Sequence, residues 1–437
     1  MHRSIRLAGL VLAVVLFQAC SGSSSSSFVP ASSTRTSEYN GVVATAWGNL
    51  QYDRVREEGL TPPVAARIFG YAGVGLYEAV VAGMPKHRSL VGQLNELTSL
   101  PRPEDGQTYQ WELVANAALA RILSGLFPAT SSDSIAALET QIESDRDDVD
   151  AGVADRSREY GRALGDAILA WAATDGYDEF NNCDYTPPVG PGLWEPTPPA
   201  FAPALQPCWG QIRTFVLGAA NACEAPIPSL YSESPSSRFY QDSLEVYETV
   251  NNATPEQMLI AEYWADNPGQ TGTPPGHWMA IVDDVVTQYD YSLAVAAEAY
   301  ARVGLAVHDA FVACWYSKYD INLLRPVTYI QNFIDGAWVS PVGTPPFPEY
   351  TSGHSVQSGA ASTVLTDQFG AFLPFEDDTH VDRGFDPETY VSFEQAANEA
   401  AISRLYGGIH YRPACELGVD QGRCIGQAIV TNVVFEN

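Results

Sequence analysis

AVHDAFVACWYSKYDINLLRP, residues 306–326, is a largely apolar stretch with helical periodicity that carries two cations. At about 100° per residue, Lys318 and Arg325 would project about 20° apart on one helix, with Trp315 and Asn322 on the same side. A cation buried in apolar surroundings needs an anionic partner. The stretch therefore predicts an anion site built on a buried helix, in preference to a solvated basic stripe.

Apolar residues recur at helical spacing over most of the remaining chain, whereas the alternation typical of strands is nearly absent. This pattern predicts an all-α fold class, with two packed helical bundles and long ordered loops. Pro62 and Pro63 would start one of the helices. Residues 180–232, rich in Pro, Gly and Trp, predict a long ordered loop region. The expected helical stretches are 41–175, 234–265, 277–324, 354–371, 391–406 and 415–432.

The N-terminus resembles an export signal. The apolar run Leu7–Phe17 follows basic residues and is shorter than the ~20 residues needed to span a bilayer. Cys20 precedes a Ser-rich run, as at a bacterial lipoprotein cleavage site. We expect lipidation at Cys20 and a place at the outer membrane or cell surface; ordinary cleavage nearby would instead release a periplasmic or secreted protein. The expected organisation is 1–19 signal peptide, 20–40 low-complexity tether and 41–437 one α-helical domain, with an N-terminal bundle over about 41–232 and a C-terminal, site-bearing bundle over about 233–437.

Charge and cysteine usage narrow the function classes. The formal net charge of −29 repels phosphate backbones and excludes nucleic acid as a reasonable partner. Cys314 lies in an apolar helix and is expected to be a buried thiol. The remaining cysteines can form disulfides in an exported chain, but the connectivity stays open. No Cys or His spacing matches a zinc motif, so no zinc site is predicted.

A second candidate segment is FPEYTSGH, residues 347–354, which opens a helix. Ser352 offers a hydroxyl and Gly353 an unhindered N–H at the positive end of the helix dipole, a combination suited to an oxyanion. His354 could give or take a proton near neutral pH. By itself this pattern also fits an ordinary serine N-cap.

The third segment is SRLYGGIH, residues 403–410. Arg404 can donate two hydrogen bonds to an oxyanion, and the glycine pair lets the backbone turn tightly toward a ligand. His410 offers a ring nitrogen as nucleophile or ligand. Residues 214–437 hold only eight Lys and Arg, and Lys318, Arg325 and Arg404 are three of them. The three segments together therefore predict one cationic cage.

The order Lys-x6-Arg-Pro, Ser-Gly-His and Ser-Arg-x5-His resembles the signature shared by vanadium-dependent haloperoxidases and the type 2 phosphatidic acid phosphatases. The resemblance covers about 310–412 and extends upstream to Pro62-Pro63-x-Ala-Ala-Arg and Thr273-Pro-Pro-Gly-His277-Trp278, which are similar to bacterial haloperoxidase segments. It implies vanadate as cofactor, hydrogen peroxide and halide as substrates, His410 as the ligand of the metal and His354 as the acid–base group. The vanadate oxygens would be held by Lys318, Arg325, Ser352, Gly353 and Arg404, with Lys318 also polarising the peroxide.

The resemblance further implies a halide pocket lined by Trp315 and Phe347. Many family members carry an Asp four residues after the last His, where this chain has Ala414. That departure disfavours a phosphatase, and it leaves open what orients His410; a backbone carbonyl is one candidate. Bromide-using relatives often have His in place of Phe347.

The expected function is oxidation of halide by hydrogen peroxide to hypohalous acid, with iodide ahead of bromide, as in the bacterial iodoperoxidase branch. The alternative is an exported acid phosphatase acting through a phosphohistidine at His410. A lipoprotein that only binds an anion is a third class. Among the other histidines, His277 is expected to pack in a loop, and His87 and His380 to be exposed. His308, with Asp309, is expected either to support the site residues from outside the ligand shell or to form a core polar pair.

Overall fold

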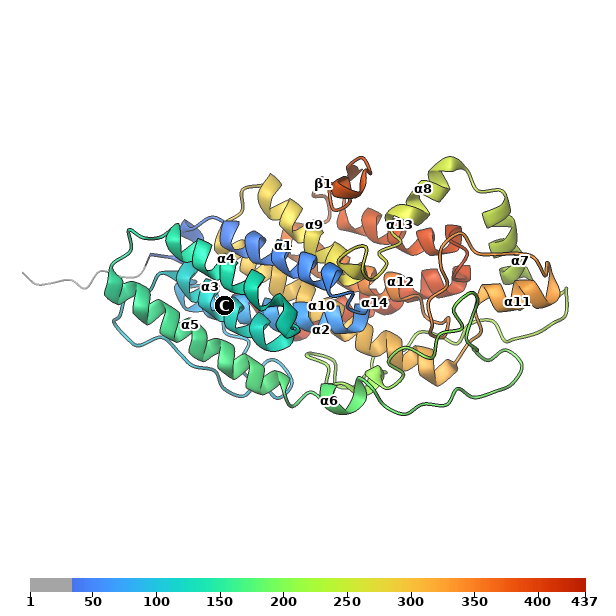
Figure 1. Cartoon of the computed structure of the whole chain (residues 1–437), viewed down its shortest axis with the longest axis horizontal. Helices are drawn as coiled ribbons and strands as arrows, with labels where there is room; N and C mark the ends of the chain where they lie inside the picture. Colours follow the sequence, from blue (N-terminus) through green and yellow to red (C-terminus); the bar gives the residue numbers. More distant parts are fainter. Residues whose placement is uncertain (1–33) are drawn as a thin grey trace, which may run out of the picture.

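The computed structural model describes residues 34–437, and within this range the chain is built almost entirely of helices (Figure 1). The predicted signal peptide and the lipidation at Cys20 lie outside the described residues. Two short antiparallel strands, β1 (Phe375–Asp377) and β2 (Glu388–Tyr390), form a hairpin. The helices are α1 (Val42–Glu57), α2 (Pro62–Val80), α3 (Trp111–Leu126), α4 (Ser132–Ser144), α5 (Ala151–Ala172), α6 (Tyr177–Phe180), α7 (Arg238–Asn251), α8 (Pro255–Tyr263), α9 (Thr273–Gln288), α10 (Leu293–Ile321), α11 (Pro326–Phe333), α12 (Gly353–Phe369), α13 (Phe393–Tyr406) and α14 (Arg412–Asn432).

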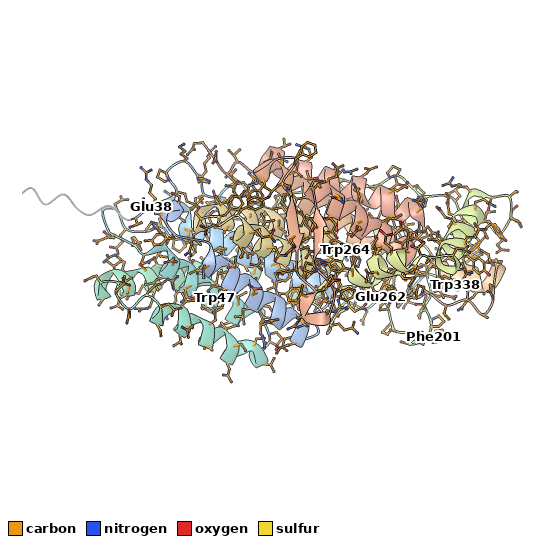
Figure 2. All side chains as sticks on the ribbon, turned by 90° about the horizontal axis from the view of Figure 1, so that it is seen from above. Glu38, Trp47, Phe201, Glu262, Trp264 and Trp338 are labelled. Carbon is orange, nitrogen blue, oxygen red and sulfur yellow. A yellow bond between two sulfur atoms is a disulfide. The ribbon has the colours of Figure 1, made fainter. Side chains whose placement is uncertain are left out.

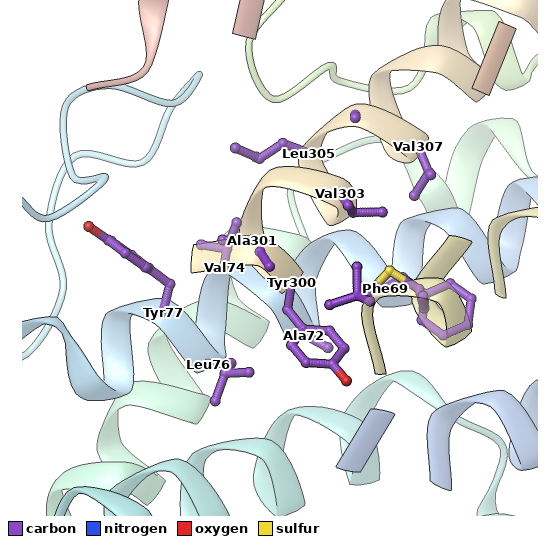
Figure 3. Close-up of a cluster of buried hydrophobic side chains, with 14 of the residues drawn as sticks. Phe69, Ala72, Val74, Leu76, Tyr77, Tyr300, Ala301, Val303, Leu305 and Val307 are labelled. Atoms are coloured by element: carbon purple, nitrogen blue, oxygen red, sulfur yellow. The ribbon is translucent and has the colours of Figure 1, made fainter. Parts of the chain in front are cut away.

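The all-α prediction is confirmed, and the molecule is elongated along one axis. Helices α3, α4 and α5 gather at one end, and α7, α8 and α11 at the other (Figure 1). Between them α10 packs against α2 on one side and α12 on the other. Figure 3 shows the α2–α10 contact, with Phe69 and Val74 near Tyr300 and Val303. One continuous hydrophobic core runs from α1 to the C-terminus, so it joins the two halves of the chain.

Helix α2 is long and apolar enough to cross a membrane, but it is almost wholly buried inside the protein. Pro62 and Pro63 occupy its first turn, as expected. The folded part begins before residue 41, because Thr36 is buried and its hydroxyl donates to the Val80 carbonyl at 2.8 Å. The end of the expected tether is therefore packed against α2.

The loop predicted for 180–232 is present and ordered, with a single 3-10 turn at Trp209–Gln211. Disulfides Cys183–Cys208 and Cys223–Cys424 hold it, the second one to α14. Cys314 is a buried free thiol, as expected. The loop thereby becomes a fixed wall of the molecule.

Candidate active site

The three candidate segments meet at the side of α10 that faces α12. Helix α10 ends at Ile321, where Asn322 has the left-handed conformation (φ +52°). Arg325 is consequently the extended N-cap residue of α11, and the expectation that Lys318 and Arg325 share one helix face is wrong. Both side chains nevertheless reach the same place, because the turn at Asn322 folds Arg325 back toward the end of α10. Lys318 and Arg325 are both fully buried.

Ser352 and Gly353 begin α12. Ser352 is the N-cap, and its hydroxyl accepts from the Ser355 N–H at 3.4 Å. Gly353 is the first residue of the helix, so its N–H has no acceptor within the helix. Gly353 and His354 line a cavity of about 310 Å³. The dipole end of α12 thus faces this cavity.

Arg404 and His410 come from the end of α13 and the tight turn that follows it. Gly408, at φ +73°, makes this turn and returns the chain to the cavity. Arg404 is fully buried, and His410 is nearly so. His410 and Arg404 both line the same cavity as His354.

Several buried nitrogens around this cavity have no partner among the described residues. They are Arg325 Nη2, Arg404 Nη1 and His354 Nε2. The other nitrogens of the two guanidinium groups are satisfied: Arg325 Nε donates to the Phe347 carbonyl at 2.8 Å, and Arg404 Nη2 to the Ala261 carbonyl at 2.7 Å. Buried donors are rarely left unpaired, so the free nitrogens mark a place for an anion. The donor set fits a tetrahedral or trigonal-bipyramidal oxyanion.

Lys318 is already engaged in this structure. Its ammonium donates to the carbonyls of Pro348 (3.1 Å), Glu349 (3.0 Å) and Thr351. Burial lowers its pKa to about 8. Lys318 therefore holds the segment that leads into Ser352 in place. Its charge also makes the electrostatic potential in the cage more positive.

His410 is held by a carboxylate. Its Nδ1 lies 2.8 Å from Glu349 Oε1, which also accepts from the Tyr411 N–H at 2.9 Å. Burial, and then the charges of Arg325 and Lys318, lower the pKa of His410 well below its usual value, so the ring is neutral. A neutral ring that donates from Nδ1 keeps the lone pair on Nε2, which lies 3.2 Å from Arg325 Nη1. Glu349 thus selects the tautomer.

Sequence reasoning missed Glu349. The sequence leaves the partner of His410 open, with a backbone carbonyl as one candidate, whereas the structure supplies a side chain 61 residues away. A signal was available, because Glu349 is the only acidic residue between Asp335 and Asp367. It is fully buried, and burial raises its pKa to about 7 although Arg325 and Lys318 oppose this shift.

The wall beside the cage is aromatic. The rings of Trp315 and Phe347 lie 4.9 Å apart between centroids, and both line the cavity together with Phe311. Lys318 Nζ lies 5.0 Å from the centroid of Phe347, and the Arg325 guanidinium carbon 4.9 Å from it. Phe347 therefore contacts both cations and presents an apolar surface beside them.

The remaining histidines differ in how well they were predicted. His380 was expected to be exposed and is fully buried, because the turn after β1 folds over α9 and pairs it with Asp266 at 3.1 Å. His87 is largely buried too, 3.1 Å from Glu298. His308 and Asp309 are buried polar residues of α10, and each is hydrogen-bonded to the 213–217 loop.

Comparison with known proteins identifies the family. A family model for the second helical-bundle domain of vanadium chloroperoxidase matches residues 298–343 and 334–435. The crystal structure of a bacterial vanadium-dependent iodoperoxidase is 38% identical, covers 91% of this chain and 98% of its own, and superposes with a TM-score of 0.87. The chain belongs to the vanadium-dependent haloperoxidases.

Other members of this family are more distant. Vanadium chloroperoxidase of Curvularia inaequalis is 23% identical over 460 residues, covering 80% of this chain and 74% of that protein. A holo-type bacterial vanadium-dependent chloroperoxidase, 14% identical, covers 85% of this chain and 92% of its own with a TM-score of 0.65, and shares the fold. The chain is therefore a peroxidase-type enzyme that uses vanadate and oxidises halide with hydrogen peroxide. The phosphatase alternative is not supported.

Proposed function

We propose that iodide is the preferred halide of this haloperoxidase, with bromide as the second candidate. The observation that carries the proposal is the 38% identity, over nearly the whole chain, to a protein described as an iodoperoxidase. The pocket supports it, because Trp315, Phe347 and Phe311 form an apolar wall with no ionisable group. A large polarisable anion loses less hydration free energy than a small one on entering such a wall.

We propose that His410 Nε2 binds the vanadium, and that Arg325, Arg404, Ser352 and the Gly353 N–H hold the vanadate oxygens. Support comes from Arg325 Nη2 and Arg404 Nη1, which are buried donors with no acceptor among residues 34–437. Lys318 contributes charge through the segment it braces. When bound, vanadate supplies Lewis-acid activation of the peroxide without a change of oxidation state.

His354 is the proposed acid–base group. Its ring is hydrogen-bonded to the Trp264 backbone, while Nε2 has no partner in the part of the chain that the structure describes. Burial, and then Arg404, lower its pKa to about 3, so the ring is neutral and Nε2 carries a lone pair, although it is a weak base before the anion binds. An anion in the cage would offset the charge of Arg404 and raise this pKa, so that Nε2 can hold the proton until it is returned during halide oxidation.

The experiment uses the protein lacking its signal segment, purified in phosphate-free buffer. Orthovanadate is added, and oxidation of iodide and of bromide by peroxide is followed, with p-nitrophenyl phosphate hydrolysis in parallel. We expect vanadate-dependent triiodide formation and a smaller kcat/KM for bromide. His410→Ala should abolish the vanadate-dependent oxidation of both halides. A bromide rate equal to the iodide rate would reject the halide preference, and activity retained by His410→Ala would reject the ligand.

We propose further that the protein is exported and anchored by a lipid at Cys20. The two disulfides support an oxidising compartment. Labelling cells with a fatty-acid analogue should mark the wild type and leave Cys20→Ala unlabelled. Equal labelling of both, or a wild type found free in the medium, would instead favour the secreted alternative.

A further inference from the structure

A second group of possible metal ligands lies beside the vanadate cage and is not used by the proposed mechanism. Asp266 follows α8, His277 lies in the first turns of α9, and His380 lies in the turn after β1. All three side chains are buried to 2% exposure or less. We propose that Asp266, His277 and His380 bind one divalent transition-metal ion, with zinc as the ion that suits them best.

The ligand atoms already converge. Asp266 Oδ2 lies 2.9 Å from His277 Nδ1, and Asp266 Oδ1 lies 3.1 Å from His380 Nε2. One atom from each of the three residues falls within 4.8 Å of the others. A tetrahedral zinc ion with bonds of about 2.0–2.1 Å keeps its ligand atoms about 3.3 Å apart. To admit it, the two Asp266–histidine distances would lengthen by a few tenths of an ångström, and ligand atoms that now lie up to 4.8 Å apart would approach by up to about 1.5 Å.

Charge balance favours a cation at this place. Asp266 and Asp377 are both buried, and neither forms an ion pair with a lysine or arginine among residues 34–437. Two buried carboxylates without a cation are costly. A divalent ion between neutral histidines would balance both charges. Without the ion, a protonated His277 would have to supply the positive charge between the two carboxylates. The experiment below distinguishes the metal-bound state from this metal-free state.

The surroundings of His277 resemble those of a ligating histidine. Its Nε2, the nitrogen away from Asp266, lies 2.9 Å from Asp377 Oδ2. Metal-bound histidines usually donate their second N–H to such a carboxylate. The ring also stacks on Trp264, with centroids 4.2 Å apart. In Figure 2, Trp264 lies in the middle part of the molecule, between Trp47 and Trp338.

Imidazole and carboxylate ligands suit zinc and its neighbours in the first transition row, and they are too nitrogen-rich for calcium or magnesium. Asp266 lines the active-site cavity, which gives the ion a way in. The three ligands come from three chain segments, one of which carries Trp264, the backbone partner of His354. The ion would therefore fix the cavity wall behind the acid–base group.

The test is metal content, which does not depend on halide oxidation. The folded protein, loaded with zinc and then dialysed against zinc-free buffer, should retain one zinc per chain by inductively coupled plasma mass spectrometry. A strong chelator should remove it and lower Tm. Cobalt substitution should give the visible absorption of a tetrahedral site. The proposal would be overturned if the protein retained no zinc and if added zinc did not change its Tm.

His380→Ala should lose the zinc, whereas His87→Ala, which changes a histidine paired with Glu298 elsewhere, should keep it. Equal retention by the two variants would assign the ion to another site and overturn the proposal. Because vanadate-dependent activity is not the readout, failure here leaves the iodide proposal intact.

Discussion

At the scale of single residues, the contact between Glu349 and His410 determines which imidazole nitrogen faces the cage. Ala414 stands four residues after His410, at the position where the family resemblance leads us to expect an Asp. Here the carboxylate comes from the segment before α12, and Lys318 holds that segment through the Glu349 carbonyl. The carboxylate that accepts from His410 Nδ1 thus comes from another part of the chain.

We expect Glu349→Gln to weaken vanadate binding and lower kcat/KM for iodide by about 10- to 100-fold, the usual cost of losing a ligand's supporting partner. An amide can present its NH₂ group to Nδ1 and favour the wrong tautomer. Vanadate titration of the activity, with kcat measured at saturating vanadate, separates affinity from turnover.

The matched control is the double variant Glu349→Gln, Ala414→Asp, which restores a carboxylate at the place where relatives have one. We expect it to recover part of the lost vanadate affinity. Unchanged vanadate affinity in Glu349→Gln alone would show that the carboxylate does not orient His410.

At the scale of elements, α12 and α14 approach closely through glycines. A Cβ on Gly422 would overlap the Val356 carbonyl, and one on Gly359 would overlap the Val419 carbonyl. Ser352 and Gly353 begin α12. The distance between α12 and α14 therefore also sets the position of these two residues.

Gly422→Ala should therefore push the two helices apart and lower the free energy of unfolding by about 2–3 kcal/mol, as overpacking does. Urea unfolding measures this, and vanadate affinity should fall as well. Gln427→Ala, at an exposed position of the same helix, is the control. Equal stabilities of the two variants would contradict the packing argument.

Helix α10 is tied to the long loop by Asp309. Its carboxylate accepts from the N–H groups of Phe215 (2.6 Å), Val216 (2.9 Å) and Leu217 (2.9 Å). Burial raises its pKa to about 6, against 3.8 ordinarily. The stability associated with this raised pKa is fully present below 3.8 and is lost as the pH rises through 6.

Asp309→Asn should destabilise the protein by about 2 kcal/mol, because an amide cannot accept from all three donors. Asn does not titrate, so the difference from wild type should shrink by about 1 kcal/mol between pH 5 and pH 7. Urea unfolding at both values tests this. A difference that grows with pH would mean that the Asp309 pKa is lowered.

At the scale of the whole molecule, the two disulfides close loops of very different length. Cys183 and Cys208 are 25 residues apart, and Cys223 and Cys424 are 201 apart. The second pair joins the long loop to the last helix, in a molecule whose main core cluster holds residues from both halves of the chain.

Chain entropy predicts a loss of about 5 kcal/mol for Cys223→Ser, Cys424→Ser and about 3–4 kcal/mol for Cys183→Ser, Cys208→Ser. Calorimetry of both double variants should show the larger fall in Tm for the longer loop. The opposite order would indicate that local strain or packing dominates the entropy of the unfolded chain.

The helices and the members of the cage could be predicted because they depend on short-range features. Helical periodicity, Pro62-Pro63 and the Ser352 cap act over a few residues. Errors arose where a position depends on a distant partner. His380 has polar neighbours in sequence, yet Asp266, 114 residues away, buries it. Arg325 was expected to lie on the same helix as Lys318, but the left-handed residue Asn322 ends that helix three residues before Arg325.

The sequence by itself determined the all-α class, the family signature and which side chains are candidates for anion binding. Only the tertiary structure decided that Glu349 orients His410 and that Lys318 donates to the backbone carbonyls of the segment before Ser352. It also decided that Asp266, His277 and His380 converge. The physical reason is that helix formation and capping depend on neighbours in sequence. Desolvation, by contrast, makes each buried charge depend on whichever partner the packing of distant segments brings within hydrogen-bond distance.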